Sequence, residues 1–422
     1  MVTAPTVFDV LDVLGLARLV KRDGALDGSV PLRAAQGCAP LLEGNAFGFQ
    51  VMPRQPITLR RGAGGVTVEM PSPYGEVFAT TYETVLPRLI AQGILRPDDG
   101  LLNGFISTEG QGDTPRARLW TGLLLRADHG VWLRISGAAN RRNRFIAVEE
   151  QVIADGRRFV PLILTITLPP RAPDRITLAG EIATVAPVAP GGCIEEVALA
   201  DAPEIGAAHA AFYDDAYFVA KTGGVTRKYR KMKPPPPPDC SDVDSPARTR
   251  LIAVGPSGHR IAGPIPRIVF TNLVPFEARF DGYTLSVEVD QLALRAGASA
   301  VERAFAQAMG PGFLGLHPRS VLYFTKYVTH HPHGEPHFFI KPWSFVQTPP
   351  GWSCLLEGVH GDGFDVLRGV VATDMFHATP AVFHLFRTDE TVRVELGQPL
   401  LHAIPIPRRL LRAGFREVAL RP

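Results

Sequence analysis

A histidine-rich segment at residues 330–337 is the part of the sequence best suited to chemistry. It runs His-His-Pro-His-Gly-Glu-Pro-His. Because alternate residues of an extended chain share a face, one side of the segment is expected to carry four ligands: His331, His333, Glu335 and His337. Imidazole and carboxylate groups bind Zn, Fe, Mn and Ni. The sequence therefore predicts a metal site at these four residues, holding a divalent transition metal, Fe or Zn.

A second group of candidates lies further along the chain. Asp374 and His377 are three residues apart, and histidine titrates near neutral pH. We predict that this pair supplies the catalytic acid or base beside the metal. His384 and the polar turn His360-Gly361-Asp362 are further residues that can complete the site through folding. Cys354 is flanked by apolar residues and is expected to be buried rather than nucleophilic.

The histidines are distributed unevenly along the chain. Only His129 and His209 lie in the first half, and the other ten of the twelve lie from His259 onward. This asymmetry matters because the chain carries an internal duplication. If two copies share a fold, their cores need similar residues, so the extra histidines indicate a distinct role for the second copy.

The duplication is marked by identical residues at a constant offset of 219. The anchor pairs are Pro56 with Pro275, Arg60 with Arg279, Val68 with Val287, Glu69 with Glu288, Asp155 with Asp374 and Pro161 with Pro380. An ordered series with one spacing predicts a repeated structure. We place the first copy at 1–205, a junction at 206–245, and the second copy, with the histidine-rich segment, at 246–422.

Each copy has the pattern of a mainly β unit. Apolar and polar residues alternate over 66–69 and 285–289, which is typical of strands with one solvated face. The apolar run at 162–168 indicates a buried strand. Helical spacing appears once in each copy, over 78–89, where Pro87 interrupts the pattern, and over 301–309. The predicted fold is two tandem, similar β-barrel, β-clip or sandwich-like domains, each with one helix.

The junction contains a basic segment followed by a proline run. Residues 227–233 hold five basic residues, Arg227, Lys228, Arg230, Lys231 and Lys233, and residues 234–238 are all proline. Consecutive prolines favour an extended polyproline II conformation. Two interpretations stay open: a stiff solvated linker, or a basic arm at Arg227–Lys233 that binds an acidic partner.

The closing segments of each copy resemble the dUTPase-like β-clip family. In the second copy the matching segments are 369–374 (Gly-Val-Val-Ala-Thr-Asp), 380–383 (Pro-Ala-Val-Phe) and 396–405, which begins with Leu-Gly-Gln-Pro. The resemblance implies the fold without the reaction. Ala372 stands at the family's aspartate position, and the family's Ser-Gly phosphate-binding motif has no counterpart in this sequence.

Composition limits the other classes of function. The net charge of +3 gives no specific signal for nucleic acid. The four cysteines are scattered with no CxxC pair, so a reduced, cytoplasmic setting is expected. No apolar stretch reaches the roughly 18 residues of a membrane span. Walker, dinucleotide-binding and Gly-x-Ser-x-Gly motifs are absent from the sequence.

These observations lead to two functional hypotheses. The first is a metal-dependent enzyme, a non-haem oxidoreductase acting on a small molecule or peptide, with its site in the second copy. The second is a non-catalytic binding or assembly protein built from duplicated β domains.

Overall fold

The computed structural model describes most of the chain. The described residues are 5–24, 38–62, 65–71, 74–97, 106–109, 115–138, 140, 145–154, 156–169, 172–190, 192–213, 229, 232, 247–256, 258–330, 336–361 and 363–419. The chain forms two compact units, each assembled from more than one segment. Unit 1 comprises Met1–Arg22, Phe47–Pro190 and Leu410–Pro422, and unit 2 comprises Asp23–Ala46 and Gly191–Arg409.

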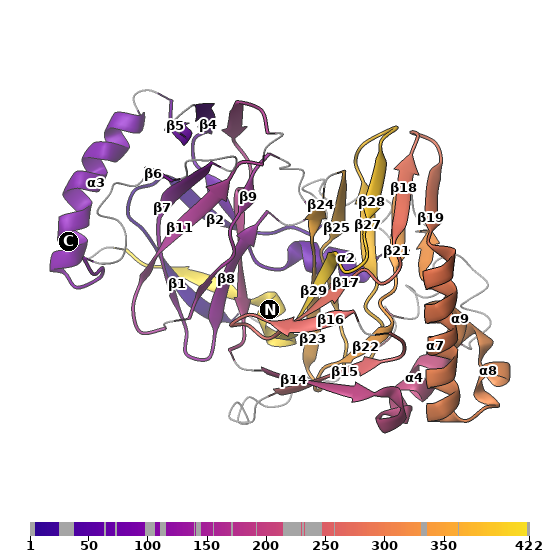
Figure 1. Ribbon diagram of the computed structural model, residues 1–422. Helices are drawn as coiled ribbons and strands as arrows, with labels where there is room; N and C mark the ends of the chain where they lie inside the picture. Colours follow the sequence, from indigo (N-terminus) through magenta and orange to yellow (C-terminus); the bar gives the residue numbers. More distant parts are fainter. Residues whose placement is uncertain are drawn as a thin grey trace. The chain divides into compact units, whose positions relative to one another are not determined.

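Unit 1 consists of three sheets and one described helix (Figure 1). Its elements are β1 (Thr6–Asp12), β2 (Ala17–Lys21), β3 (Phe49–Pro53), β4 (Ile57–Gly62), β5 (Gly65–Glu69), α3 (Tyr74–Ala91), β6 (Ile106–Glu109), β7 (Arg116–Ala127), β8 (Trp132–Gly137), β9 (Ala147–Val148), β10 (Gln151–Ile153), β11 (Val160–Thr167), β12 (Arg175–Leu178), β13 (Ala183–Val188) and β30 (Gly414–Glu417). The sheet orders are β30-β1-β7-β11-β9 with β6 on β7, β10-β8-β13-β3-β2, and β12-β4-β5.

Unit 2 has four sheets and a layer of helices. Its strands are β14 (Gly192–Ala198), β15 (Ala247–Ala253), β16 (His259–Ala262), β17 (Arg267–Thr271), β18 (Phe276–Phe280), β19 (Leu285–Val289), β20 (Val328–His330), β21 (His337–Ile340), β22 (Ser344–Gln347), β23 (Trp352–Gly358), β24 (His360–Gly361), β25 (Phe364–Leu367), β26 (Gly369–Val371), β27 (Ala381–Leu385), β28 (Thr391–Val394) and β29 (Pro399–Pro407). Its helices are α2 (Ala39–Ala46), α4 (Pro203–Tyr213), α7 (Gln291–Met309), α8 (Phe313–Leu316) and α9 (Pro318–Thr325).

The strand orders of the two units match. The order β10-β8-β13-β3-β2 in unit 1 corresponds to β26-β23-β29-β17-β16 in unit 2, and β12-β4-β5 corresponds to β28-β18-β19. The remaining sheet of unit 1 corresponds to two sheets of unit 2, β14-β15-β22 and β20-β21-β27-β25-β24, because the long strand β7 is matched by β21 and β22 in succession. The prediction of two similar, mainly β domains is therefore confirmed, and none of the described sheets closes into a barrel.

The two units differ from contiguous copies in one respect, the origin of one edge strand. β1 pairs in parallel with β30, the last strand of the chain. β15, the first strand of the second copy, pairs in parallel with β14 over seven residues. The predicted ranges 1–205 and 246–422 place β14 with the first copy and β30 with the second. Each last strand thus completes the unit that holds the other copy's remaining strands.

β30 is held in unit 1 by both apolar and polar contacts. The Phe415 ring lies 5.6 Å from Phe8 and 5.2 Å from Phe49, between ring centroids. Arg416 donates from Nε to Oδ1 of the buried Asp9 at 2.8 Å, and Arg126 pairs with the other carboxylate oxygen. A strand brought from the far end of the chain is therefore anchored as firmly as a local one.

The two predicted helices are present and begin earlier than the apolar spacing indicated. α7 begins where Asp290 caps it, since Oδ1 accepts from the amides of Leu292 at 2.9 Å and Ala293 at 3.0 Å. It ends at Gly310, whose φ of 90° suits glycine. α3 contains Pro87 and continues to Ala91. In unit 2, α4, α8 and α9 pack with α7 into a helical layer (Figure 1).

Of the basic junction segment, only Tyr229 and Met232 belong to the described residues. The linker and the basic-arm interpretations both stay predictions. No described helix combines the length and the apolar character that crossing a membrane requires.

Candidate functional site

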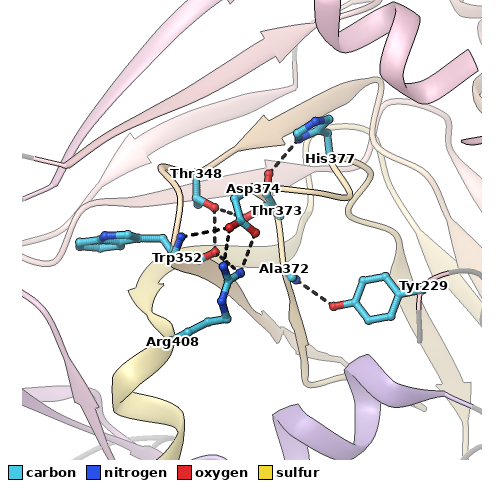
Figure 2. A network of polar contacts seen from close by, with 9 residues as sticks. Tyr229, Thr348, Trp352, Ala372, Thr373, Asp374, His377 and Arg408 are labelled. Carbon is cyan, nitrogen blue, oxygen red and sulfur yellow. Dashed lines mark hydrogen bonds and ion pairs between the residues drawn. The ribbon is translucent and has the colours of Figure 1, made fainter. Parts of the chain in front are cut away.

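The predicted catalytic residue Asp374 is part of a buried ion pair in unit 2 (Figure 2). Arg408 donates from Nη1 to Asp374 Oδ1 at 2.6 Å and also contacts Oδ2. The amide of Gly351 donates to Oδ2 at 3.1 Å. The Asp374 side chain is 2% exposed and that of Arg408 is 13% exposed. Both carboxylate oxygens are occupied by donors within the protein.

His377, the other predicted catalytic residue, is engaged with the same turn. Its Nδ1 lies 2.8 Å from the carbonyl oxygen of Thr373 and therefore donates to it, and its own carbonyl oxygen accepts from Val346 at 2.9 Å. Burial lowers the pKa of His377, so the ring is neutral at pH 7. The described contacts include no hydrogen bond between Asp374 and His377. These contacts account for both residues as parts of the turn, and their catalytic role stays a prediction.

The same turn is tied to its surroundings by hydroxyl groups. The Thr348 and Thr373 hydroxyls lie 2.8 Å apart, and the Tyr229 hydroxyl accepts from the Ala372 amide at 2.9 Å (Figure 2). Ala372 is the residue at the aspartate position of the β-clip family, and in this chain its amide serves packing. Burial also raises the pKa of the Cys354 thiol, on β23, which makes that group unreactive.

The predicted metal-dependent oxidoreductase is corrected by the structure. Within the described residues, no group of three or more His, Cys, Asp or Glu side chains is arranged to hold a metal ion. Of the four predicted ligands, only His337 is described; His331, His333 and Glu335 lie outside the described residues. The His337 ring is stacked on that of His384, with centroids 4.4 Å apart and planes 3° from parallel. Parallel stacking makes the two rings a packed pair, whereas shared ligands would converge on one point.

His337 belongs to a row of ionisable side chains across one sheet of unit 2. His337 on β21 is directly opposite His384 on β27, which is opposite Asp365 on β25, which is opposite His360 on β24. Directly paired residues of antiparallel strands project from the same face. These four residues, the imidazole row, therefore lie side by side on adjacent strands.

The row is buried at one end and exposed at the other. His337 is 5% exposed and Asp365 is 9% exposed, whereas the side chain of His360 is 57% exposed. His360 Nδ1 lies 2.8 Å from Asp365 Oδ1. The hydrogen bond to Asp365 is the main reason that the pKa of His360 is raised, and the charge of Glu357 adds to it. Because Nδ1 is bound to Asp365, Nε2 is the His360 nitrogen left to meet a ligand.

Unit 1 carries different chemistry at the same positions. Arg118 precedes His337 by 219 residues and Thr165 precedes His384 by 219 residues, and Arg118 is directly opposite Thr165 on β7 and β11. Glu149 donates its amide to the Thr165 carbonyl oxygen at 2.9 Å. The row of unit 1 is thus arginine, threonine and glutamate, which keep one charge state near neutral pH.

Asp365 is the member of the row that the sequence analysis missed. A signal for it exists, because Asp-Gly at 362–363 is typical of a two-residue hairpin loop. Such a loop pairs the residues on either side of it, first Gly361 with Phe364 and then His360 with Asp365, as the described strands do. The pairing with His384 needs the neighbouring strand and has no such local signal.

Comparison with known proteins gives one distant likeness. No protein-family model and no curated protein matches the chain. Among solved structures, the chain is similar to 2'-deoxycytidine 5'-triphosphate deaminase from Agrobacterium tumefaciens, with 10% identity, a TM-score of 0.28, and coverage of 85% of this chain and 88% of that chain. A superposition this weak supports a distant resemblance to the dUTPase-like fold and no argument about function.

Proposed function

We propose that this chain is a non-catalytic binding or assembly protein, and that the imidazole row of unit 2 contacts its ligand. The observation that carries the proposal is the His360–Asp365 pair at the exposed end of the row. Asp365 orients the ring and favours its protonated form, so His360 can present Nε2–H as a charge-assisted donor. The row stands on paired strands, which hold it more rigidly than a loop would.

The ligand that best fits this donor is acidic. A protonated imidazole donates to a carboxylate oxygen, and a peptide with several carboxylates can contact more than one ring of the row. Unit 1 has Arg118 and Thr165 at the positions of His337 and His384, so it lacks the pattern. The proposed partner is therefore an acidic peptide bound by unit 2.

The test is nuclear magnetic resonance of histidine side chains during titration with an oligoglutamate peptide. We expect saturable shifts of the His360 and His384 resonances at pH 6.5. His129, exposed in unit 1, serves as the internal control and should not shift. In the variant His360→Gln the response of His384 should weaken, whereas His129→Gln should leave it unchanged. Equal shifts at all three histidines, or none, would contradict the proposal.

A further inference from the structure

A second site, separate from the imidazole row, surrounds the amine of Lys341. Lys341 directly follows β21 and is 7% exposed. Its Nζ donates to the Thr329 hydroxyl, on β20, at 2.6 Å. The same nitrogen lies 4.6 Å from the centroid of the Tyr323 ring, on α9. The amine is therefore held in one place by a hydroxyl on one side and an aromatic face on the other.

The charges that face Lys341 do not favour a buried ammonium group. The neighbouring charge that acts on it is that of Lys326, which is like its own. His209, on α4, is also close enough to interact, but burial lowers the pKa of its ring to about 3, so it is neutral. No carboxylate among the described residues lies within ion-pair distance of Nζ. Burial, followed by the repulsion from Lys326, lowers the pKa of Lys341 to about 7.

Aromatic rings form the wall behind this amine. The His209 ring contacts Tyr323 at 5.2 Å, Tyr213 at 4.6 Å and Phe345 at 4.9 Å, between centroids. These rings come from α4, α9 and β22, so the helical layer of unit 2 builds the wall. An apolar wall desolvates the amine, which is how proteins make a lysine nucleophilic near neutral pH.

Unit 1 cannot contain an equivalent site. The residue 219 positions before Lys341 is Gly122, where φ is +78° and an added Cβ would stand 2.6 Å from the Leu14 Cβ. A lysine has no room there. The amine is thus a specific feature of unit 2, as the imidazole row is, and packing of the shared fold does not require it.

We propose that the Lys341 amine is a nucleophilic site that captures a small aldehyde or ketone as an imine. The Nζ lone pair attacks the carbonyl carbon, a C–N bond forms, and the carbonyl oxygen takes up a proton to give a carbinolamine. Loss of water then leaves a C=N bond, so the net reaction joins amine and carbonyl with release of one water. The step needs no oxidant or reductant, and the Tyr323 face stabilises the protonated imine.

The test uses the full chain, glycolaldehyde and sodium cyanoborohydride, which reduces an imine to a stable secondary amine. Peptide mass mapping then compares Lys341 with the exposed Lys326 in the same molecule. At pH 7 we expect Lys341 to react about tenfold faster or more, because an ordinary lysine, with a pKa of about 10.4, is almost fully protonated there. The advantage should shrink as the pH approaches 10. A Lys341 rate equal to or below that of Lys326 at pH 7 would overturn the proposal.

A pair of variants separates reactivity from folding. Thr329→Val removes the hydroxyl that accepts from the ammonium form, so the midpoint of the pH–rate profile for Lys341 should move to lower pH. Thr329→Ser keeps the hydroxyl and should leave the midpoint in place. Circular dichroism checks that both variants fold. Identical midpoints in the two variants would show that this environment does not control the amine and would reject the assignment.

Discussion

Unit 1 and unit 2 share strand orders but differ in the side chains that those strands carry. At positions separated by 219 residues, Arg118 is replaced by His337, Thr165 by His384 and Gly122 by Lys341. Residues that pack between strands keep their apolar character in both units, because core packing tolerates little change. Residues that face outward, or the added helical layer, are free to change. The comparison teaches that a duplicated fold can retain its framework while one copy gains titratable groups.

The units also differ in their buried ion pairs. In unit 1, Arg22 pairs with Glu181, and both side chains are fully buried. In unit 2 the buried pair is Asp374 with Arg408, on a different part of the framework. An ion pair taken out of water must be matched in charge, or the remaining charge is destabilising. Each unit has thus its own electrostatic requirement, and each can be tested separately.

The largest expected effect is on unit 2 through Asp374. Asp374→Asn removes the charge that balances the buried Arg408, and we expect a loss of about 3 kcal/mol in the free energy of unfolding, measured by urea denaturation. The control is Asp389→Asn, which breaks the exposed pair with Arg279, where the side chains are 63% and 54% exposed. Its cost should stay below about 0.5 kcal/mol. Equal costs would mean that Asp374 is not a structural residue.

The next effect concerns the strand that unit 1 receives from the end of the chain. Phe415→Ala removes a half-buried ring from its contacts with Phe8 and Phe49, which should cost about 2 kcal/mol. Hydrogen exchange should accelerate at the β1 amides and remain unchanged at the β15 amides, because β30 pairs with β1. Phe415→Leu, which keeps an apolar side chain, should show a smaller change. Acceleration at β15 instead would contradict the described pairing.

The smallest effect is the pH dependence of the imidazole row. The raised pKa of His360 means that its ion pair with Asp365 stabilises the fold fully at pH values below the pKa of an unfolded histidine, near 6.5. This stabilisation is lost as the pH rises through the folded pKa. Because the His360 side chain is 57% exposed, solvent limits the effect to about 0.5 kcal/mol. The difference in unfolding free energy between the native chain and Asp365→Asn should therefore fall between pH 6 and pH 8.5. A difference that grows over this range would be inconsistent with the pairing.

The predicted strands and helices depended on signals close together in the sequence. Alternation over 285–289 identified β19, and helical spacing ending at Gly310 identified α7. The helices α4, α8 and α9 were not predicted, because α8 and α9 are short and the apolar residues of α4 do not lie on one stripe. Their stability comes from packing with α7, which local spacing does not reveal.

The candidate site was predictable only in part, for the same reason. The histidine count correctly pointed to the second copy as the chemically distinct one. It pointed to the wrong function, because a strand pattern places ligands on one face but does not show whether they converge. His337 stacks on His384, and that partner was fixed by the register of β27. Asp374 seemed available for catalysis until Arg408 was found beside it.

The sequence by itself determined the class of fold, the repeated pattern and the uneven supply of titratable residues, because strand alternation, helix caps and residue counts are local or additive properties. The tertiary structure alone decided which last strand completes which unit, which residues face His384, and how deeply Lys341 is buried. These properties arise from pairing and packing between segments far apart in the chain. The charge state and reactivity of a side chain depend on such neighbours, so function in this protein was set at the level of packing.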